Sequence, residues 1–180
     1  QFKIINDGIF NIPEDIEINN RLERILKRKQ DILSNNSKLD WSHAELLALG
    51  SVIEKGMNIR LTGQDSERGT FSQRHAVLHD INNGKKYIPL NHIFPDQKEI
   101  QIKNSPLTEM ATLAFEYGYT LNSENNFVLW EAQFGDFVNN AQTVIDEYIS
   151  SGFSKWGINS SLVMLLPHGY EGQGPNHSSA

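Results

Sequence analysis

Apolar residues recur at helical spacing between Asn104 and Tyr119. The pattern predicts a helix whose first turn is capped by Ser105 or Thr108, with Pro106 at a first-turn position. Glu109 falls in that first turn, where the helix dipole favours a carboxylate. We expect the recurring apolar side chains to form one buried face: Leu107, Met110, Leu113, Ala114 and Tyr117.

The first 56 residues are predicted to form an irregular start followed by two helices. Residues 1–18 show no clear period, and we expect an extended linker there, around Ile9, Ile12 and Pro13. An amphipathic helix with a basic outer face is predicted over residues 19–33. A second helix is predicted over residues 41–55, with Gly56 at its C-terminal stop.

Short apolar or alternating runs predict strands among these helices, at residues 58–62, 99–103, 127–131 and 162–166. Asn82-Asn83-Gly84 between two further short runs predicts a hairpin. Residues 136–151 are predicted to form a helix closed by Gly152. This alternation favours an α/β fold with a mainly parallel sheet flanked by helices.

The domain organisation follows from the same pattern. Residues 1–39 are interpreted as a linker and an amphipathic helix, and residues 40–180 as one domain. The sequence stops after a Gly-rich loop, which predicts that the chain is a fragment and that the domain is incomplete at its C-terminus.

Composition excludes several classes of function. The 180 residues carry a formal net charge of -6, which argues against a nucleic-acid partner. No apolar run approaches the roughly 18 residues of a membrane-spanning helix. The chain has no cysteine, which excludes disulfides and thiolate metal sites and makes a reducing compartment the default. No His, Asp and Glu spacing indicates a metal site.

Polar and aromatic residues follow three of the predicted strands. In an open α/β sheet such loops meet at the carboxyl edge, where ligands bind. The residues are Gln64 and Asp65, then Gln133, Phe134 and Phe137, then His168 and His177. Each also has a simpler explanation, because first-turn glutamates, core phenylalanines and exposed loop histidines are common.

Five segments carry a resemblance to a known family. They are Gly-Gln-Asp-Ser-Glu-Arg-Gly-Thr-Phe within 63–80, Pro-Leu-Thr-Glu at 106–109, Leu-Trp-Glu-Ala-Gln-Phe-Gly-Asp-Phe at 129–137, Phe-Ser-Lys-Trp-Gly at 153–157 and Leu-Leu-Pro-His-Gly-Tyr-Glu-Gly-Gln-Gly-Pro at 165–175. In this order they resemble the thiamine diphosphate-dependent, decarboxylating component of 2-oxoglutarate dehydrogenase complexes, from about residue 11 to residue 180. The resemblance implies the pyrimidine-binding domain of the thiamine diphosphate-binding fold.

The resemblance also assigns roles to individual residues. Glu109 would be catalytic, since its counterpart hydrogen-bonds a ring nitrogen of the cofactor's aminopyrimidine. Phe134 or Phe137 would lie against that ring, with Gln64 and Gln133 as further cofactor-binding residues. His177 would lie beside the reacting carbonyl of the substrate, and His168 begins the same loop. Asn176 stands where the family usually has Glu.

The implied function is that of a larger enzyme. It would oxidatively decarboxylate 2-oxoglutarate in the tricarboxylic acid cycle and pass the succinyl group to the lipoyl carrier of dihydrolipoyl succinyltransferase. The family is homodimeric and binds the diphosphate and magnesium on a domain that no segment of this chain resembles, so we expect the chain alone to be inert. The compartment would be bacterial cytoplasm or mitochondrial matrix.

Two alternatives stay open. One is a related 2-oxo acid dehydrogenase, such as one for 2-oxoadipate, and a comparison of turnover with different 2-oxo acids would separate it. The other is a non-catalytic dimerisation module, which predicts self-association that survives replacement of Glu109 and His177.

Overall fold

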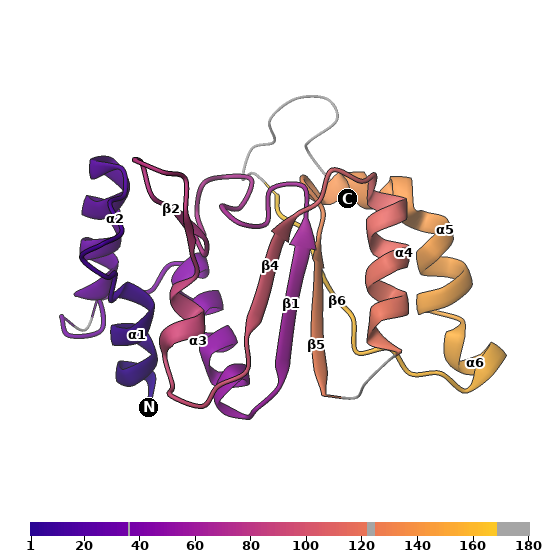
Figure 1. Cartoon of the computed structure of the whole chain (residues 1–180). Coiled ribbons are helices and arrows are strands. Elements are labelled where there is room, and N and C mark those ends of the chain that lie inside the picture. Colours follow the sequence, from indigo (N-terminus) through magenta and orange to yellow (C-terminus); the bar gives the residue numbers. More distant parts are fainter. Residues whose placement is uncertain (36, 122–124, 169–180) are drawn as a thin grey trace. The chain divides into compact units, whose positions relative to one another are not determined.

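The computed structural model describes residues 1–35, 37–121 and 125–168 (Figure 1). The chain forms two compact units. The N-terminal unit comprises Gln1–Met57 and Ser72–Ile100, and the sheet unit comprises Asn58–Phe71 and Gln101–Ala180.

The N-terminal unit is built from helices and one hairpin. Its helices are α1 (Phe2–Phe10), α2 (Asn20–Gln30), α3 (Trp41–Glu54) and the short 3₁₀ helix η1 (Pro89–His92). Strands β2 (Leu78–His79) and β3 (Lys86–Tyr87) pair antiparallel. The predicted hairpin is therefore confirmed, and Gly84 in its turn has a φ of 72°, which glycine adopts without strain.

The prediction of an extended linker over residues 1–18 is wrong for its first half, which forms α1. Ile5 and Ile9 are 0% and 5% exposed, and α1 packs against α3. A Cβ added to Gly50 of α3 would lie 2.2 Å from Ile5 Cγ2, so α1 reaches α3 only because residue 50 lacks a side chain. This packing stabilises a helix that the local sequence pattern does not predict.

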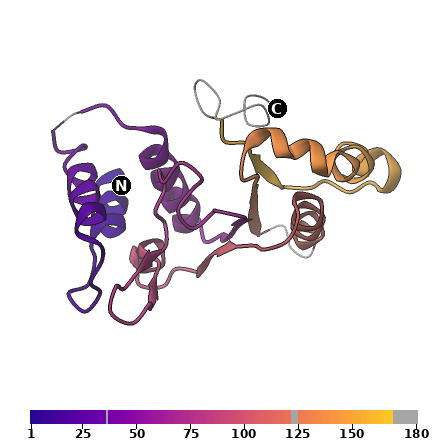
Figure 2. The ribbon, with the colours of Figure 1, turned by 90° about the horizontal axis from the view of Figure 1, so that it is seen from above.

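The sheet unit contains four strands in the order β4-β1-β5-β6. Their bounds are β1 (Asn58–Gly63), β4 (Ile100–Asn104), β5 (Asn126–Glu131) and β6 (Val163–Leu165). β1 pairs parallel with β5 and β5 with β6, and the arrows of β4 and β1 run the same way in Figure 1. Figure 2 views the same strands from above, with α4 beside them. The mainly parallel α/β fold is thus confirmed.

Helix α4 (Glu109–Thr120) begins where Thr108 accepts a hydrogen bond from the Ala111 backbone N–H. Thr108 is therefore the cap, and Pro106 lies outside the helix rather than in its first turn. The predicted buried face is only partly correct. Leu113 and Tyr117 are buried, but Leu107 and Met110 are 49% exposed and Ala114 is exposed.

The buried side of α4 also carries polar residues, which are Glu109, Thr112, Glu116 and Thr120. The Glu116 carboxylate accepts hydrogen bonds of 2.7 and 2.9 Å from Arg60 Nε and Nη2. Arg60 also donates to Gln101 Oε1 at 2.9 Å. Buried polar groups persist where partners satisfy them, and hydrophobic spacing alone does not reveal those partners.

The helix predicted over residues 136–151 is a succession of short helical segments. They are η2 (Gly135–Ala141), α5 (Gln142–Val144), the π-helical η3 (Ile145–Ile149) and α6 (Gly152–Trp156). Gly152 begins α6, and the left-handed stop residue is Gly157, with φ 67°. Val138, Ala141 and Val144 recur every three residues, which suits a 3₁₀ turn, and they pack in one core with Trp130.

Candidate functional site

Loops from several strands meet at the carboxyl edge of the sheet. The Ser105 backbone N–H donates to Gly63 O at 2.7 Å, joining the loop after β4 to the end of β1. The Gly135 N–H donates to Pro167 O at 2.8 Å, joining the loops after β5 and β6. Parallel strands bring their carboxyl ends to one edge, so residues distant in sequence gather there.

Gly63 allows β1 and β5 to approach closely at this edge. A Cβ at residue 63 would lie 2.1 Å from Glu131 O and 2.6 Å from Ser66 Oγ. No side chain fits that space, so the chain can turn from β1 into the loop over residues 64–71 only with glycine at this position.

Glu109 is the first residue of α4 and is 8% exposed. Gln64 Nε2 donates to Glu109 Oε1 at 3.2 Å. Glu109 Oε2 has no hydrogen-bond partner within the described ranges, and the helix N-terminus favours its negative charge. Among the described residues, Glu109 therefore keeps one carboxylate oxygen available to a further hydrogen-bond donor.

Three phenylalanines in the segments that follow β1 and β5 form a cluster. The Phe134 ring makes edge contacts with Phe71 and with Phe137, at centroid distances of 5.9 and 5.8 Å. Phe134 and Phe137 are partly buried, so neither residue is fully enclosed by the described part of the chain. A flat heteroaromatic group gains contact energy against such rings.

The loop over residues 64–71 also holds Gln133. Gln133 Nε2 donates to Asp65 Oδ2 at 3.0 Å, and Thr70 Oγ1 donates to the Gln133 backbone carbonyl. Gln64 and Asp65 are neighbours in the chain, so this loop contacts both Glu109 and Gln133.

His168 lies against the loop after β5. A Cβ added to Gly135 would lie 2.2 Å from His168 Cε1, so the imidazole occupies the space that the glycine leaves. His168 Nδ1 lies 2.7 Å from Leu166 O. A carbonyl can only accept, so Nδ1 carries a proton, and in the neutral imidazole Nε2 is then an acceptor.

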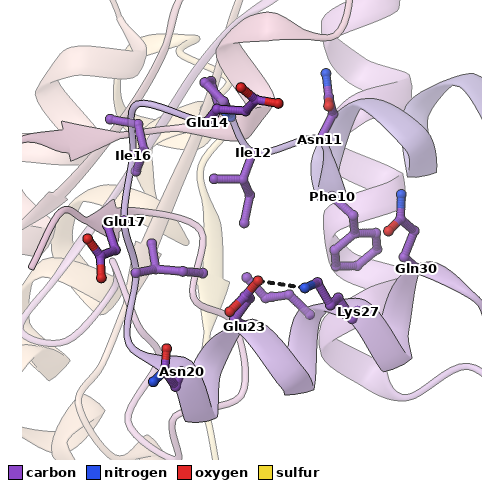
Figure 3. Close-up of a pocket in the computed structure, with 13 residues that line it drawn as sticks. Phe10, Asn11, Ile12, Glu14, Ile16, Glu17, Asn20, Glu23, Lys27 and Gln30 are labelled. Carbon is purple, nitrogen blue, oxygen red and sulfur yellow. Dashed lines mark hydrogen bonds and ion pairs between the residues drawn. The ribbon is translucent and has the colours of Figure 1, made fainter.

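A pocket of about 670 Å³ in the N-terminal unit contains none of the predicted site residues (Figure 3). Phe10, Ile12 and Ile16 line it together with Glu14 and Glu17. Glu23 in its wall pairs with Lys27 at 2.6 Å. The chemistry that the sequence singles out lies at the sheet edge instead.

Comparison with known proteins agrees with this arrangement. Residues 37–180 match the model of the transketolase pyrimidine binding domain. The chain belongs to this family. The pyrimidine-binding domain thus accounts for the parallel sheet and for the loops that meet at its carboxyl edge.

Curated relatives are similar over nearly the whole chain. The 2-oxoglutarate dehydrogenase E1 component of Geobacillus kaustophilus is 55% identical over 97% of the chain, and that of Bacillus subtilis is 52% identical over 97%. The mitochondrial 2-oxoglutarate dehydrogenase of Schizosaccharomyces pombe is 51% identical over 99%. The chain spans only 18% of the length of each of these relatives.

The pyrimidine-binding domain brings most of the predicted site residues together. Gln64 touches Glu109, while Gln133, Phe134 and Phe137 lie in the segment directly after β5. His168 joins them through Gly135. His177, predicted to be catalytic and to bind the substrate, lies outside the described residues.

Sequence reasoning gave no role to Arg68, Thr70 or Gly135. Arg68 Nη2 pairs with Asp65 at 3.1 Å, and the contacts of Thr70 and Gly135 are given above. The only sequence signal for these residues is that they lie in the quoted motifs. Neither an ion pair nor the packing of an imidazole against a glycine leaves a recognisable pattern in the sequence.

No group of three or more His, Cys, Asp or Glu side chains in the described ranges could hold a metal ion. Within the same ranges, none of the helices has the length and apolar character needed to cross a membrane.

Proposed function

We propose that this pyrimidine-binding domain belongs to a thiamine diphosphate-dependent 2-oxoglutarate dehydrogenase. The whole protein would oxidatively decarboxylate 2-oxoglutarate and transfer the succinyl group to a lipoyl carrier in the tricarboxylic acid cycle. The names of the similar proteins support this proposal. The observation that carries it is Glu109, held by Gln64 with its second carboxylate oxygen unpartnered in the described part of the chain.

The residues at the sheet edge fit the aminopyrimidine of the cofactor. An aminopyrimidine offers N–H groups and a flat aromatic face, and the edge offers a carboxylate oxygen, two carboxamides and phenylalanine rings. When bound, thiamine diphosphate supplies the electron sink that decarboxylation needs.

Each of these residues has a definite task in the proposal. Glu109 accepts a hydrogen bond from the ring N–H of the aminopyrimidine, while Gln64 holds the other carboxylate oxygen in place. Phe134 or Phe137 packs against the ring face and excludes water from it. His168 presents Nε2 as a hydrogen-bond acceptor near the substrate, together with His177.

The proposed site is shared with other parts of the enzyme. Magnesium and the diphosphate are assigned to a different domain, and the complete cofactor site to two subunits of a homodimer. Leu107, which precedes α4, and Met110 and Phe115 within α4 are 49%, 49% and 56% exposed, which supports a protein contact near this helix. A further proposed partner is dihydrolipoyl succinyltransferase in the same complex. The proposed location is bacterial cytoplasm or mitochondrial matrix.

Replacement of Glu109 tests the proposal. In the full-length enzyme, Glu109→Gln should slow hydrogen exchange at C2 of bound thiamine diphosphate by about 10²- to 10⁴-fold, the usual contribution of a positioned proton-transfer group. The carboxamide cannot exchange a proton with the ring nitrogen as a carboxylate does. NMR after quenched exchange in D₂O would measure the rate.

The matched control is Glu54→Gln, because Glu54 is an exposed glutamate at the end of α3. It should exchange at the wild-type rate. Near-normal exchange in the Glu109→Gln enzyme would remove Glu109 from the mechanism.

A further inference from the structure

Gln133 is held by the loop over residues 64–71 through both its backbone and its side chain. Thr70 Oγ1 donates to its backbone carbonyl, and its own Nε2 donates to Asp65 Oδ2 at 3.0 Å. Asp65 and Gln133 are 68 positions apart in sequence, and they follow β1 and β5, which pair with each other. The contact is therefore produced by the fold.

The partner of Gln133 decides which way its carboxamide points. An ionised carboxylate only accepts hydrogen bonds, so Asp65 requires the amide nitrogen of Gln133 to face it. Gln133 Oε1 has no hydrogen-bond partner in the part of the chain that the structure describes. Without Asp65 the carboxamide could turn over and exchange its oxygen for its nitrogen at little steric cost.

Asp65 is itself held in place. Arg68 Nη2 lies 3.1 Å from Asp65 Oδ1, so each carboxylate oxygen has a different partner. Arg68 Nη1 also donates to Thr70 O at 3.0 Å, and Gly69 N–H donates to Asp65 O at 2.7 Å in a turn where Gly69 has φ 79°. Both side chains of the ion pair are partly exposed, so orientation is a better explanation of it than stability.

We propose that Asp65, held by Arg68, is a positioning residue that keeps the amide oxygen of Gln133 available as an acceptor for an N–H of the bound aminopyrimidine. Gln64 precedes Asp65 and fixes Glu109, so one loop orients both acceptors of the site. This inference rests on the proposed function, because it concerns the same cofactor.

The experiment measures thiamine diphosphate binding to the full-length enzyme, with magnesium, by calorimetry. Asp65→Ala should weaken binding about 3- to 10-fold, as expected for the loss of one oriented hydrogen bond. Gln133→Glu should weaken it further, because two carboxylates would then face each other. Adding Asp65→Asn to Gln133→Glu should restore much of the affinity, since the Asn amide can donate to Glu and leave an oxygen free.

The chain offers a matched control in Asp146→Ala. Asp146 accepts a hydrogen bond from Gln142 Nε2 at 2.8 Å on the exposed surface of the same unit, so the variant removes the same kind of pair away from the sheet edge. Its affinity for the cofactor should equal that of the wild type.

The outcomes separate the two proposals. Unchanged affinity in Asp65→Ala, or no rescue in the double variant, would overturn the positioning role of Asp65. A drop in the Tm of the cofactor-free protein that accounts for the whole loss would also overturn it. Failure of the wild-type enzyme to bind thiamine diphosphate would overturn the proposed function itself.

Discussion

At the scale of single residues, Gly63 has the strictest steric requirement at the sheet edge. An added Cβ would lie 2.1 Å from the backbone oxygen of Glu131 in the paired strand. Backbone cannot move aside as a flexible side chain can, so β1 and β5 would have to separate. The loop that carries Gln64 and Asp65 begins directly after this contact.

Gly63→Ala should therefore destabilise the chain by about 1–3 kcal/mol, the usual cost of overpacking, as measured by urea unfolding. Gly118→Ala is the matched control, because a Cβ at this position of α4 would meet nothing within 4 Å. It should stabilise the chain by about 0.5–1 kcal/mol through helix propensity. Equal effects of the two substitutions would contradict the steric argument.

At the scale of elements, the packing of α1 on α3 encloses His43. His43 is 0% exposed, lies edge-on to Phe10 at 5.2 Å and contacts Asn6 Oδ1 through Nε2 at 2.8 Å. Asn6 Nδ2 donates to Gln30 O at 3.1 Å, which fixes the Asn6 amide, so His43 Nε2 carries the proton. Burial lowers the pKa of His43 below its ordinary 6.5, and the nearby charge of Lys29 lowers it further, against the opposing charge of Asp40.

The depressed pKa makes the packing of α1 sensitive to acid. At His43 the folded state binds fewer protons than the unfolded state. The contribution of His43 to the free energy of unfolding is therefore fully present above pH 6.5, and it is lost as the pH falls through the lower pKa of the folded state. Urea unfolding of the chain between pH 7.5 and 5 should show this loss, and His43→Gln should make the dependence shallower. An unchanged pH profile in the variant would rule out His43 as its source.

Helix α4 shows what hydrophobic spacing cannot predict, namely which side of a helix is buried. The spacing of α4 predicts the helix, but the side that faces the sheet carries Glu109 and Glu116. Arg60 of β1 binds both carboxylate oxygens of Glu116, and Gln64 in the loop after β1 binds one oxygen of Glu109. Which side of a helix is buried was therefore decided by partners on other elements.

At the scale of the whole molecule, the proposed division of the cofactor site between domains predicts a difference in ligand stabilisation. Magnesium with thiamine diphosphate should raise the Tm of the full-length enzyme, because a ligand at 100 times its Kd stabilises by about 2.7 kcal/mol. The isolated chain should show no comparable rise, since the diphosphate is assigned to another domain. Differential scanning fluorimetry of both proteins would measure this.

The two proteins serve as controls for each other, since both carry the pyrimidine-binding domain. A comparable rise for the isolated chain would mean that it binds the diphosphate itself. No rise for either protein would contradict thiamine diphosphate as the cofactor.

The sequence by itself determined the features that depend on local signals. The strands β1 and β5, the hairpin turn at Gly84 and the place of Glu109 in a first turn follow from alternation, turn residues and capping. The parallel sheet follows from the order of elements, and it predicts that loops after several strands meet at one edge.

Only the tertiary structure decided which atoms touch. The hydrogen bonds from Gln64 to Glu109 and from Gln133 to Asp65 join residues 45 and 68 positions apart. Helix α1 likewise depends on the space left by Gly50 in α3. Such contacts depend on the three-dimensional path of the backbone, which local preferences do not contain, so the sequence named the residues of the site and the fold decided how they meet.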